Sequence, residues 1–268
     1  MRQRRKTREY VYQNKASLIV YFVLRTLVLI SMIRAVIRTD YESVFLCALT
    51  LVLMIMPSIL SKTLQLELPS TLEIIILLFI FAAEILGEIN NFYIKMPYWD
   101  TLLHTLNGFL CAAIGFALVD LMNREERFTF QLSPAFLAIV AFCFSMTVSI
   151  FWEFFEFVCD TFLSLDMQKD TIIQTINTVN LDATNSNIVV HLQDIKDVVV
   201  VYTDGTSETL KLGGYLDIGL IDTMSDLFVN LIGAIVFSII GYFYVKHKGR
   251  GKIASSFIPK IKTKKSLD

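Results

Sequence analysis

Several runs of about twenty apolar residues, separated by polar segments, constrain this chain more than any other feature of its sequence. A run of that length can cross the hydrocarbon core of a bilayer, which is roughly 30 Å thick. Backbone groups in lipid must find their hydrogen bonds inside the segment, so each run is expected to form an α-helix. The expected membrane spans are Ala16–Ile37, Ser43–Leu60, Thr71–Ile89, Thr101–Met122, Pro134–Val158 and Thr223–Val245.

The composition agrees with a membrane protein, because 54% of the residues are hydrophobic. Water-soluble proteins have roughly 45–50% apolar residues. The net charge of -1 gives no reason to expect a nucleic-acid partner. The basic stretches lie at the two ends of the chain, where membrane topology accounts for them. The sequence therefore predicts a multi-pass protein of the cell membrane, surrounded by membrane lipids.

The positions of lysine and arginine predict the orientation in the membrane. Basic residues gather in residues 1–15, in the connection that carries Arg124 and Arg127, and in residues 246–268. Six spans would place all three segments on one side, and the positive-inside rule makes that side the cytoplasm. Both termini are therefore expected in the cytoplasm.

One polar connection, residues 160–221, is much longer than the others. Within it, Asp197–Thr203 and Ser207–Leu212 flank the pair Asp204-Gly205, which favours a β-hairpin with a type I′ turn. Ile188–Leu192 could add a third strand, and Asp170–Asn187 is expected to be a loop. The predicted fold is an all-α membrane protein of six transmembrane helices, with a small external β-hairpin inserted between helices five and six. Its segments are 1–15, 16–159, 160–221, 222–245 and 246–268.

Four of the expected spans carry ionisable and amide side chains in the halves that this topology places outside. Such residues are rare in membrane spans and usually face a protein interior or a water-filled cavity. Most are three or four positions apart within one span, so they share one helix face. We expect them to line a cavity open to the outside. They are Glu84, Glu88, Asp100, His104, Asn107, Glu153, Glu156, Asp160, Asp222, Asp226 and Asn230.

Eight carboxylates and one imidazole cannot all stay charged at close range, because like charges raise one another's pKa. Shared protons, a divalent cation, or Arg25 and Arg34 could compensate. Oxygen-rich sites with one imidazole suit Mg²⁺, Mn²⁺ or Ca²⁺ better than structural zinc. The expected catalytic residues are His104, Asp100, Glu153 and Asp226, and the expected metal ligands are Glu156, Asp160, Asp222 and Asp226.

Structural explanations compete at single positions. Asp100 and Asp222 stand where helices should begin, and aspartate is a common N-cap. Glu84 and Glu88 could be solvated at a helix end. His104 could be an interior histidine with its hydrogen bonds satisfied. The set as a whole favours a functional cavity.

Three motifs in these spans resemble the YjdF-like bacterial membrane proteins. They are Asp100 to His104 (DxxxH), Trp152 to Glu156 (WExxE) and Asp222 to Asp226 (DTxxD), within a likeness that covers residues 70–245. The resemblance implies a multi-spanning membrane protein and names no reaction. A fainter likeness is to VanZ-like proteins, whose Asp…Asn…Gly helix is similar to Asp226, Asn230 and Gly233. The Pro-Gly-Arg stretch of those proteins is absent from this sequence.

Three functions follow as hypotheses. The first is action on an envelope lipid, a lipid-linked or another small-molecule substrate, by metal-assisted or acid–base hydrolysis or transfer. In it His104 is the general base or a ligand, and Asp100 orients it. The second is an ion- or proton-coupled transporter that uses the carboxylates. The third is a binding or immunity protein whose hairpin meets a partner.

Overall fold

The computed structural model describes residues 2–63, 66–124, 132–247, 257 and 260–261. The chain divides into two compact units, Met1–Phe151 with Asp226–Asp268, and Trp152–Ser225. Two helices, α7 (Pro134–Leu163) and α8 (Leu220–Lys246), contribute residues to both units.

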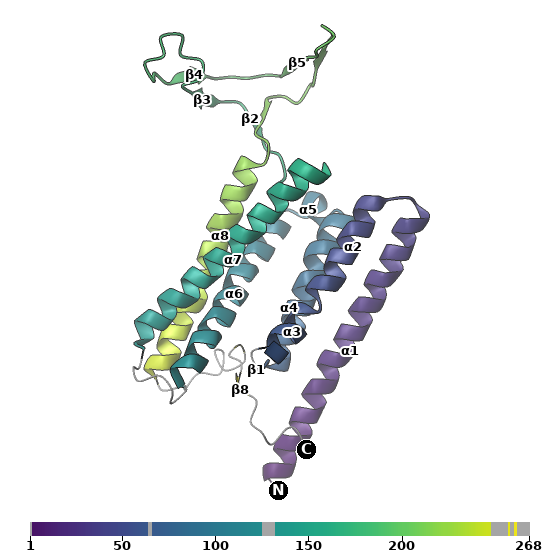
Figure 1. Cartoon of the computed structure of the whole chain (residues 1–268), viewed down its shortest axis with the longest axis vertical. Coiled ribbons are helices and arrows are strands. Elements are labelled where there is room, and N and C mark those ends of the chain that lie inside the picture. The colour runs from purple at the N-terminus through teal and green to yellow at the C-terminus, as the bar shows by residue number, and fades with distance from the viewer. Residues whose placement is uncertain (1, 64–65, 125–131, 248–256, 258–259, 262–268) are drawn as a thin grey trace. The chain divides into compact units, whose positions relative to one another are not determined.

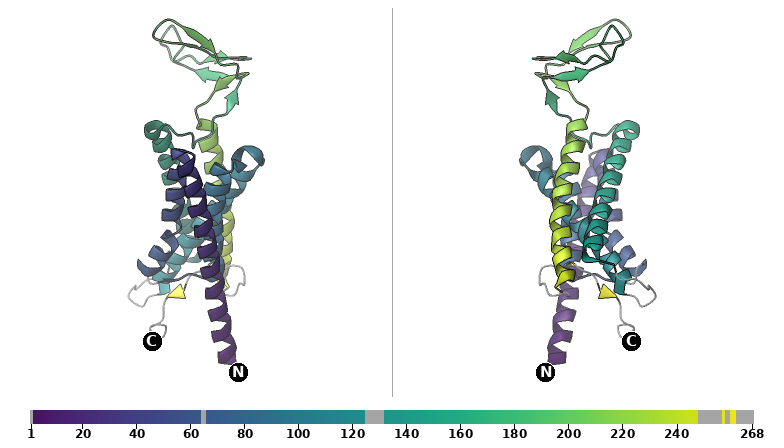
Figure 2. Two further views of the ribbon diagram at one scale, coloured as in Figure 1. Left: turned by 90° about the vertical axis from the view of Figure 1, so that its right-hand side faces the viewer. Right: turned by 90° about the vertical axis from the view of Figure 1, so that its left-hand side faces the viewer.

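The first unit is helical (Figure 1). Its first helix, α1 (Arg2–Ile37), starts well before the expected boundary at Ala16, and its N-terminal end extends past the neighbouring helices (Figure 2). Among the described residues, five helices are long and apolar enough to cross a membrane. They are Lys15–Ile37, Tyr41–Thr63, Trp99–Asp120, Pro134–Leu163 and Leu220–Lys246.

Two expected spans are built differently from a single α-helix. The second consists of α2 (Tyr41–Leu53) and α3 (Met56–Thr63), with a turn between them. Pro57 accounts for this break, since proline has no N–H to continue a helix and suits the first turn of the next one. The third expected span starts as α4 (Ser70–Phe81) and continues as a π-helix, η1 (Ala82–Ile89). Neither piece of the third span is long enough by itself to cross a membrane.

Short elements complete this unit. The four-residue helix α5 (Phe92–Lys95) connects η1 to α6 (Trp99–Arg124). Strand β1 (Leu66–Glu67) pairs antiparallel with β8 (Lys260–Ile261).

Two clusters of buried apolar side chains hold these helices together. The first joins α1, α2, α4 and η1 around Val28, Cys47, Leu77 and Ile85. The second joins α6, α7 and α8, and five of its eight buried residues are alanines: Ala112, Ala113, Ala117, Ala141 and Ala234 lie beside Phe116, Leu137 and Phe237. Small side chains let helix backbones approach closely, which is a common way to associate helices in membranes.

The second unit contains short strands between the helical residues 152–163 and 220–225. Strand β2 (Ile172–Ile173) pairs with β7 (Tyr215–Leu216), and β3 (Ile176–Thr178) pairs with β4 (Val190–Leu192). Strand β5 (Val199–Val201) pairs with β6 (Ser207–Thr209), and all three pairs are antiparallel. The expected third strand therefore exists, but it pairs with β3 rather than with the hairpin. The expected loop Asp170–Asn187 contains β2 and β3.

The strands β5 and β6 form a hairpin that turns at Asp204-Gly205, although the turn is not of type I′. A type I′ turn needs positive φ at both central residues. Here Gly205 has φ of 81°, while Asp204 is not among the residues with positive φ. The Gly205 N–H donates to the Tyr202 carbonyl at 3.0 Å, and the Asp204 carboxylate accepts from Thr206. This is the pattern of a longer loop that ends in a left-handed glycine.

A second turn in this unit, at residues 182–188, is expected to lose stability at low pH. Asp182 accepts hydrogen bonds from the hydroxyl and N–H of Thr184 and from the N–H groups of Ser186 and Ile188. These bonds lower the pKa of Asp182 from 3.8 to about 2, with the Thr184 hydroxyl as the largest cause. Because the folded-state pKa is depressed, the turn is fully stabilised above about pH 4 and loses that stabilisation as the pH falls toward 2.

The Thr184→Ala variant should raise the pKa of Asp182, as followed by NMR titration of the carboxyl carbon. Ser186→Ala is the matched control, since the Ser186 hydroxyl bonds to the Thr184 carbonyl and not to Asp182. An equal pKa in wild type and Thr184→Ala would contradict the assignment.

Candidate functional site

Two glycines bring α6 and α8 into close contact within the first unit. A Cβ atom placed on Gly108 would come closer than 3.0 Å to the Asn230 carbonyl oxygen, and one on Gly233 would do the same to the Thr105 carbonyl oxygen. The helices therefore touch through their backbones, as they do at small-residue crossings in membranes. Side chains beside this crossing necessarily face one another.

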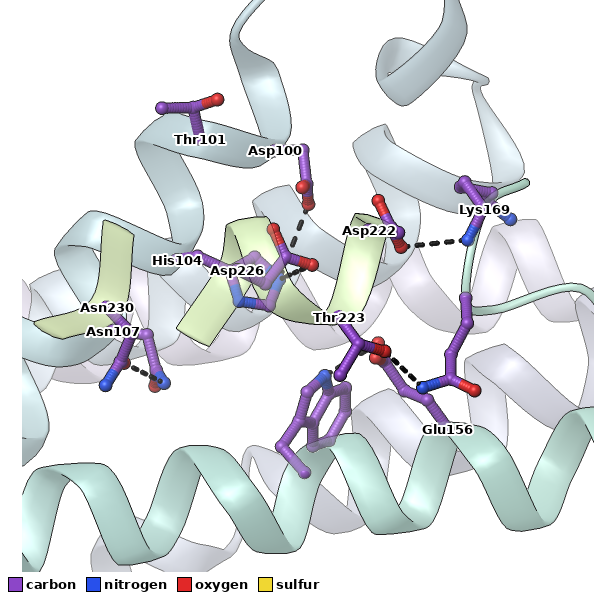
Figure 3. A network of polar contacts seen from close by, with 12 residues as sticks. Asp100, Thr101, His104, Asn107, Glu156, Lys169, Asp222, Thr223, Asp226 and Asn230 are labelled. Atoms are coloured by element: carbon purple, nitrogen blue, oxygen red, sulfur yellow. Dashed lines mark hydrogen bonds and ion pairs between the residues drawn. The ribbon is translucent and has the colours of Figure 1, made fainter. Parts of the chain in front are cut away.

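Three of these side chains meet one to two turns from the crossing (Figure 3). His104 Nε2 lies 3.4 Å from Asp100 Oδ1 on its own helix and 3.5 Å from Asp226 Oδ2 on α8. The Asp226 side chain is 4% exposed and that of His104 is 12% exposed, whereas Asp100 is 33% exposed. The donor atoms of all three residues lie within 4.8 Å of one another, which is close enough to share a metal ion.

A second polar layer lies one turn further along both helices. Asn107 Nδ2 donates to Asn230 Oδ1 at 3.1 Å, and the Asn230 amide contacts the Met146 sulfur of α7 at 3.6 Å. The Cys111 thiol donates to the Asn107 amide oxygen at 3.4 Å. Asn230 is completely buried. This layer connects the three helices beneath the Asp100–His104–Asp226 cluster.

In the second unit, two of the expected metal ligands hold a loop in place. Both carboxylate oxygens of Asp160 accept backbone N–H groups, from Met167 at 2.6 Å and from Gln168 at 2.8 Å. Asp222 accepts the N–H of Lys169 at 2.8 Å, and Thr223 accepts the Gln168 amide at 2.6 Å (Figure 3). These contacts give the two carboxylates a structural role in the segment between α7 and β2.

The remaining expected residues are distributed over both units. In the second unit, Glu153 and Glu156 are buried on α7, and Glu156 accepts the Trp152 indole N–H at 2.8 Å. In the first unit, Glu84 is buried on the π-helix, and its Oε2 atom has no hydrogen-bond partner among the described residues. Glu88 follows one turn later and is partly buried.

The two arginines proposed as counter-charges make other contacts. Arg25 donates to the Tyr21 hydroxyl, and its guanidinium lies over the Tyr21 ring at 5.1 Å from the centroid. Arg34 lines a small cavity at the end of α1.

Sequence reasoning missed two features of the first unit. Asp120 is 4% exposed near the other end of α6, and it is not among the residues that the sequence singled out. Its position within an expected span was the available signal. The Met146 contact to Asn230 had no sequence signal, because methionine in an apolar span is usually a packing residue.

Comparison with known proteins places these residues in a family. The family described as "Predicted membrane protein (DUF2238)" matches residues 19–247. An uncharacterized protein of Thermotoga maritima is 27% identical over 124 residues, which are 45% of this chain and 62% of that protein. No solved structure matches the chain. Since the matched range includes all of α6, α7 and α8 with the site residues, the chain belongs to the DUF2238 family of predicted membrane proteins.

Proposed function

We propose that Asp100, His104 and Asp226 bind a divalent cation at the outward-facing end of a six-span membrane protein. The observation that carries this proposal is the spacing of the donor atoms. The distances of 3.4 and 3.5 Å exceed those of ordinary hydrogen bonds. Ligands at roughly 2.1 Å from a cation lie about 3.0–3.4 Å apart along the edges of an octahedron or tetrahedron.

The chemistry of the donors suits a hard cation with one nitrogen ligand. Two carboxylates and an imidazole match Mn²⁺ or Mg²⁺, and Ca²⁺ would require more oxygens than these. Asp100 is the most exposed of the three, so a substrate would approach past it. At such a site His104 could bind the cation or accept a proton from a water molecule.

The substrate that we propose is an envelope lipid or a lipid-linked molecule, processed by hydrolysis or transfer. The cluster lies within the first two turns of the spans that start at Trp99 and Leu220, which is near the level of the lipid head groups. The DUF2238 match supports the YjdF-like resemblance of the motifs that supply all three residues. Four acidic residues of the second unit stay proposals by themselves: Glu153 as a catalytic residue, and Glu156, Asp160 and Asp222 as metal ligands.

The topology that we propose has both termini in the cytoplasm. The helices α4 and η1 follow one another without a break, with 12 and 8 residues, and together they are long enough to form the third span, which would bring the total to six. Reporter fusions after Arg124 and after Asn185 should report opposite compartments. The same compartment for both would contradict the six-span topology.

A proton- or ion-coupled carrier is the second candidate, and two observations favour it. Glu84 is buried within a π-helix, an element that often marks functional sites. Asp120 is buried about 24 Å along α6 from His104, given a rise of about 1.5 Å per residue. Polar groups at both ends of the helices are what a path across the membrane would need.

Thermal unfolding in detergent tests the cation site. At a Mn²⁺ concentration 100 times its Kd, binding should stabilise the wild type by about 2.7 kcal/mol. For a chain of this size that is roughly 5–10 °C in Tm. Asp226→Asn and His104→Ala should lose the shift, because the first replaces a charged carboxylate ligand with a neutral amide and the second removes the imidazole.

Asp120→Asn is the matched control, since it removes a buried carboxylate from the same α6 but outside the cluster. It should keep the Mn²⁺ shift whatever its basal Tm. A wild type whose Tm does not respond to Mn²⁺, Mg²⁺ or Ca²⁺ would overturn the cation site and favour a proton relay or a structural role for the three residues.

A further inference from the structure

A small polar cavity of about 110 Å³ lies within the first unit, where α1 ends and α2 begins. Its polar lining consists of Ser31, Arg34, Arg38, Asp40, Ser43 and Asn90. Liquid water occupies about 30 Å³ per molecule, so the cavity has room for three or four waters. A single tetrahedral oxyanion fits in that space.

The charge of the cavity is positive. Arg34 and Arg38 are four residues apart, and neither takes part in the close ion pairs found among the described residues. The Arg38 charge still acts on Asp40, whose pKa is lowered first by the hydrogen bonds from Ser43 and then by Arg38. The one carboxylate of the lining, Asp40, caps α2 and accepts the hydroxyl and the N–H of Ser43, at 2.7 and 3.0 Å. Two fixed positive charges therefore face one carboxylate that is already hydrogen-bonded.

Neighbouring groups add donors rather than acceptors. The Lys95 ammonium donates to the Asn90 carbonyl at 2.9 Å, which brings a third cation to this end of the bundle. At the end of α1, the Ala35 carbonyl oxygen accepts two backbone hydrogen bonds. The Arg38 N–H donates to it at 3.1 Å and the Asp40 N–H at 3.0 Å. Among the described lining residues, two guanidinium groups therefore stand against a single carboxylate, Asp40, whose oxygens already accept from Ser43.

The depth of the cavity in the membrane indicates the source of the anion. The membrane span of α1 ends at Ile37, so Arg34 and Arg38 lie on either side of that end. Ile33, Val36 and Ile37 are 58–78% exposed on the same stretch of helix, as expected for residues in contact with acyl chains. A lipid whose chains lie along these residues has its phosphate at the level of the two arginines.

We propose that this cavity binds the phosphate group of a membrane phospholipid. Two guanidiniums one helical turn apart can each offer paired N–H donors to phosphate oxygens, a geometry that lysine cannot reproduce. The site does not depend on the cation cluster, because the two share no residue. Its failure in a test would leave the proposed function untouched.

Lipid binding to purified full-length protein in a neutral maltoside detergent tests this inference. Dioleoyl phosphatidylglycerol is compared with dioleoylglycerol, which has the same chains and no phosphate. A Lys or Arg near a membrane surface contributes about 1 kcal/mol, which corresponds to roughly a fivefold change in affinity. Native mass spectrometry should show Arg34→Gln and Arg38→Gln each binding phosphatidylglycerol about fivefold more weakly, and the double variant about 25-fold. Arg38→Lys should recover only part of the loss.

Lys15→Gln is the matched control, since it removes an exposed charge from the other end of the same span. It should bind phosphatidylglycerol like the wild type, and all variants should bind dioleoylglycerol equally. The Tm without lipid should also stay unchanged, because Arg34 and Arg38 are exposed.

Three results would overturn the proposal. The first is wild-type affinity in the double variant, and the second is an equal loss in Lys15→Gln, which would indicate a general charge effect. The third is full competition by millimolar inorganic phosphate, which would make the site one for a free anion.

Discussion

Replacing Gly233 with valine is expected to destabilise the protein by about 3 kcal/mol or more and to abolish the Mn²⁺-dependent rise in Tm. Overfilling a packed interior usually costs about 1–3 kcal/mol where side chains can move aside. At Gly233 the obstacle is the backbone of α6 at Thr105, which can move only if the whole helix moves. Since α6 and α8 supply His104 and Asp226, their separation would also pull the cluster apart.

Gly108→Val should have the same two effects, because its obstacle is the backbone of α8 at Asn230. For a chain of this size, 3 kcal/mol corresponds to a fall of roughly 6–12 °C in Tm. Gly87→Ala is the control, since the three atoms nearest to its added Cβ belong to the ring of Tyr93, a side chain that can move aside, and not to a backbone. Differential scanning fluorimetry with and without Mn²⁺ measures both effects. A Gly233→Val protein that keeps the wild-type Tm would show that the helices do not touch there.

The helical character and the membrane class could be predicted from the sequence because they depend on local patterns. Twenty apolar residues in lipid leave the backbone no alternative to a helix, and the expected limits of α7 and α8 differ from the observed ones by only a few residues. The start of α1 differs more, because the basic residues before Lys15 continue the helix. The charged residues before Lys15 therefore mark the end of the membrane span, while the helix continues through them.

The π-helix and the break before Pro57 show where local patterns stop being sufficient. Pro57 was visible in the sequence, and its missing N–H could have predicted the break. The change from α to π geometry at Ala82 has no comparable signal in the sequence. The same holds for the pairing of β4 with β3, because a three-residue strand does not specify its partner.

For the site, residue spacing along the helices could be used for prediction, but contacts between helices could not. Four-residue spacing placed Asp100 and His104 on one face, and likewise Asp226 and Asn230. The spacing does not reveal which helix faces meet. Gly108 and Gly233 determine this, because the backbones of α6 and α8 come into contact at these two residues. Asp160 and Asp222 carried the same acidic signal, yet their oxygens accept backbone N–H groups, which residue type alone does not reveal.

The Asn107–Asn230 pair is expected to give the second large effect, as a coupling between the buried Asn230 amide and the partly buried Asn107 amide. Asn230→Leu keeps the volume but leaves the Asn107 amide without its bond to Asn230 Oδ1. Leaving a buried polar group unsatisfied costs about 1–3 kcal/mol. The double variant Asn107→Leu with Asn230→Leu removes both amides, so its cost should be smaller than the sum of the two single costs. Pairs of this kind in membrane helices couple by about 0.6 kcal/mol on average and up to about 1.7 kcal/mol.

Thermal unfolding of the wild type, both single variants and the double variant in one detergent measures the coupling. A parallel cycle of Asn107→Leu with Thr50→Ala is the control, since the Thr50 hydroxyl donates to the Leu46 carbonyl within its own helix α2. Its costs should add within about 0.5 kcal/mol, as they do for residues that share no partner. Additive costs in the Asn107–Asn230 cycle would mean that the two amides do not stabilise one another. The layer beneath the cluster would then be held by the glycine contacts and by packing on Met146 alone.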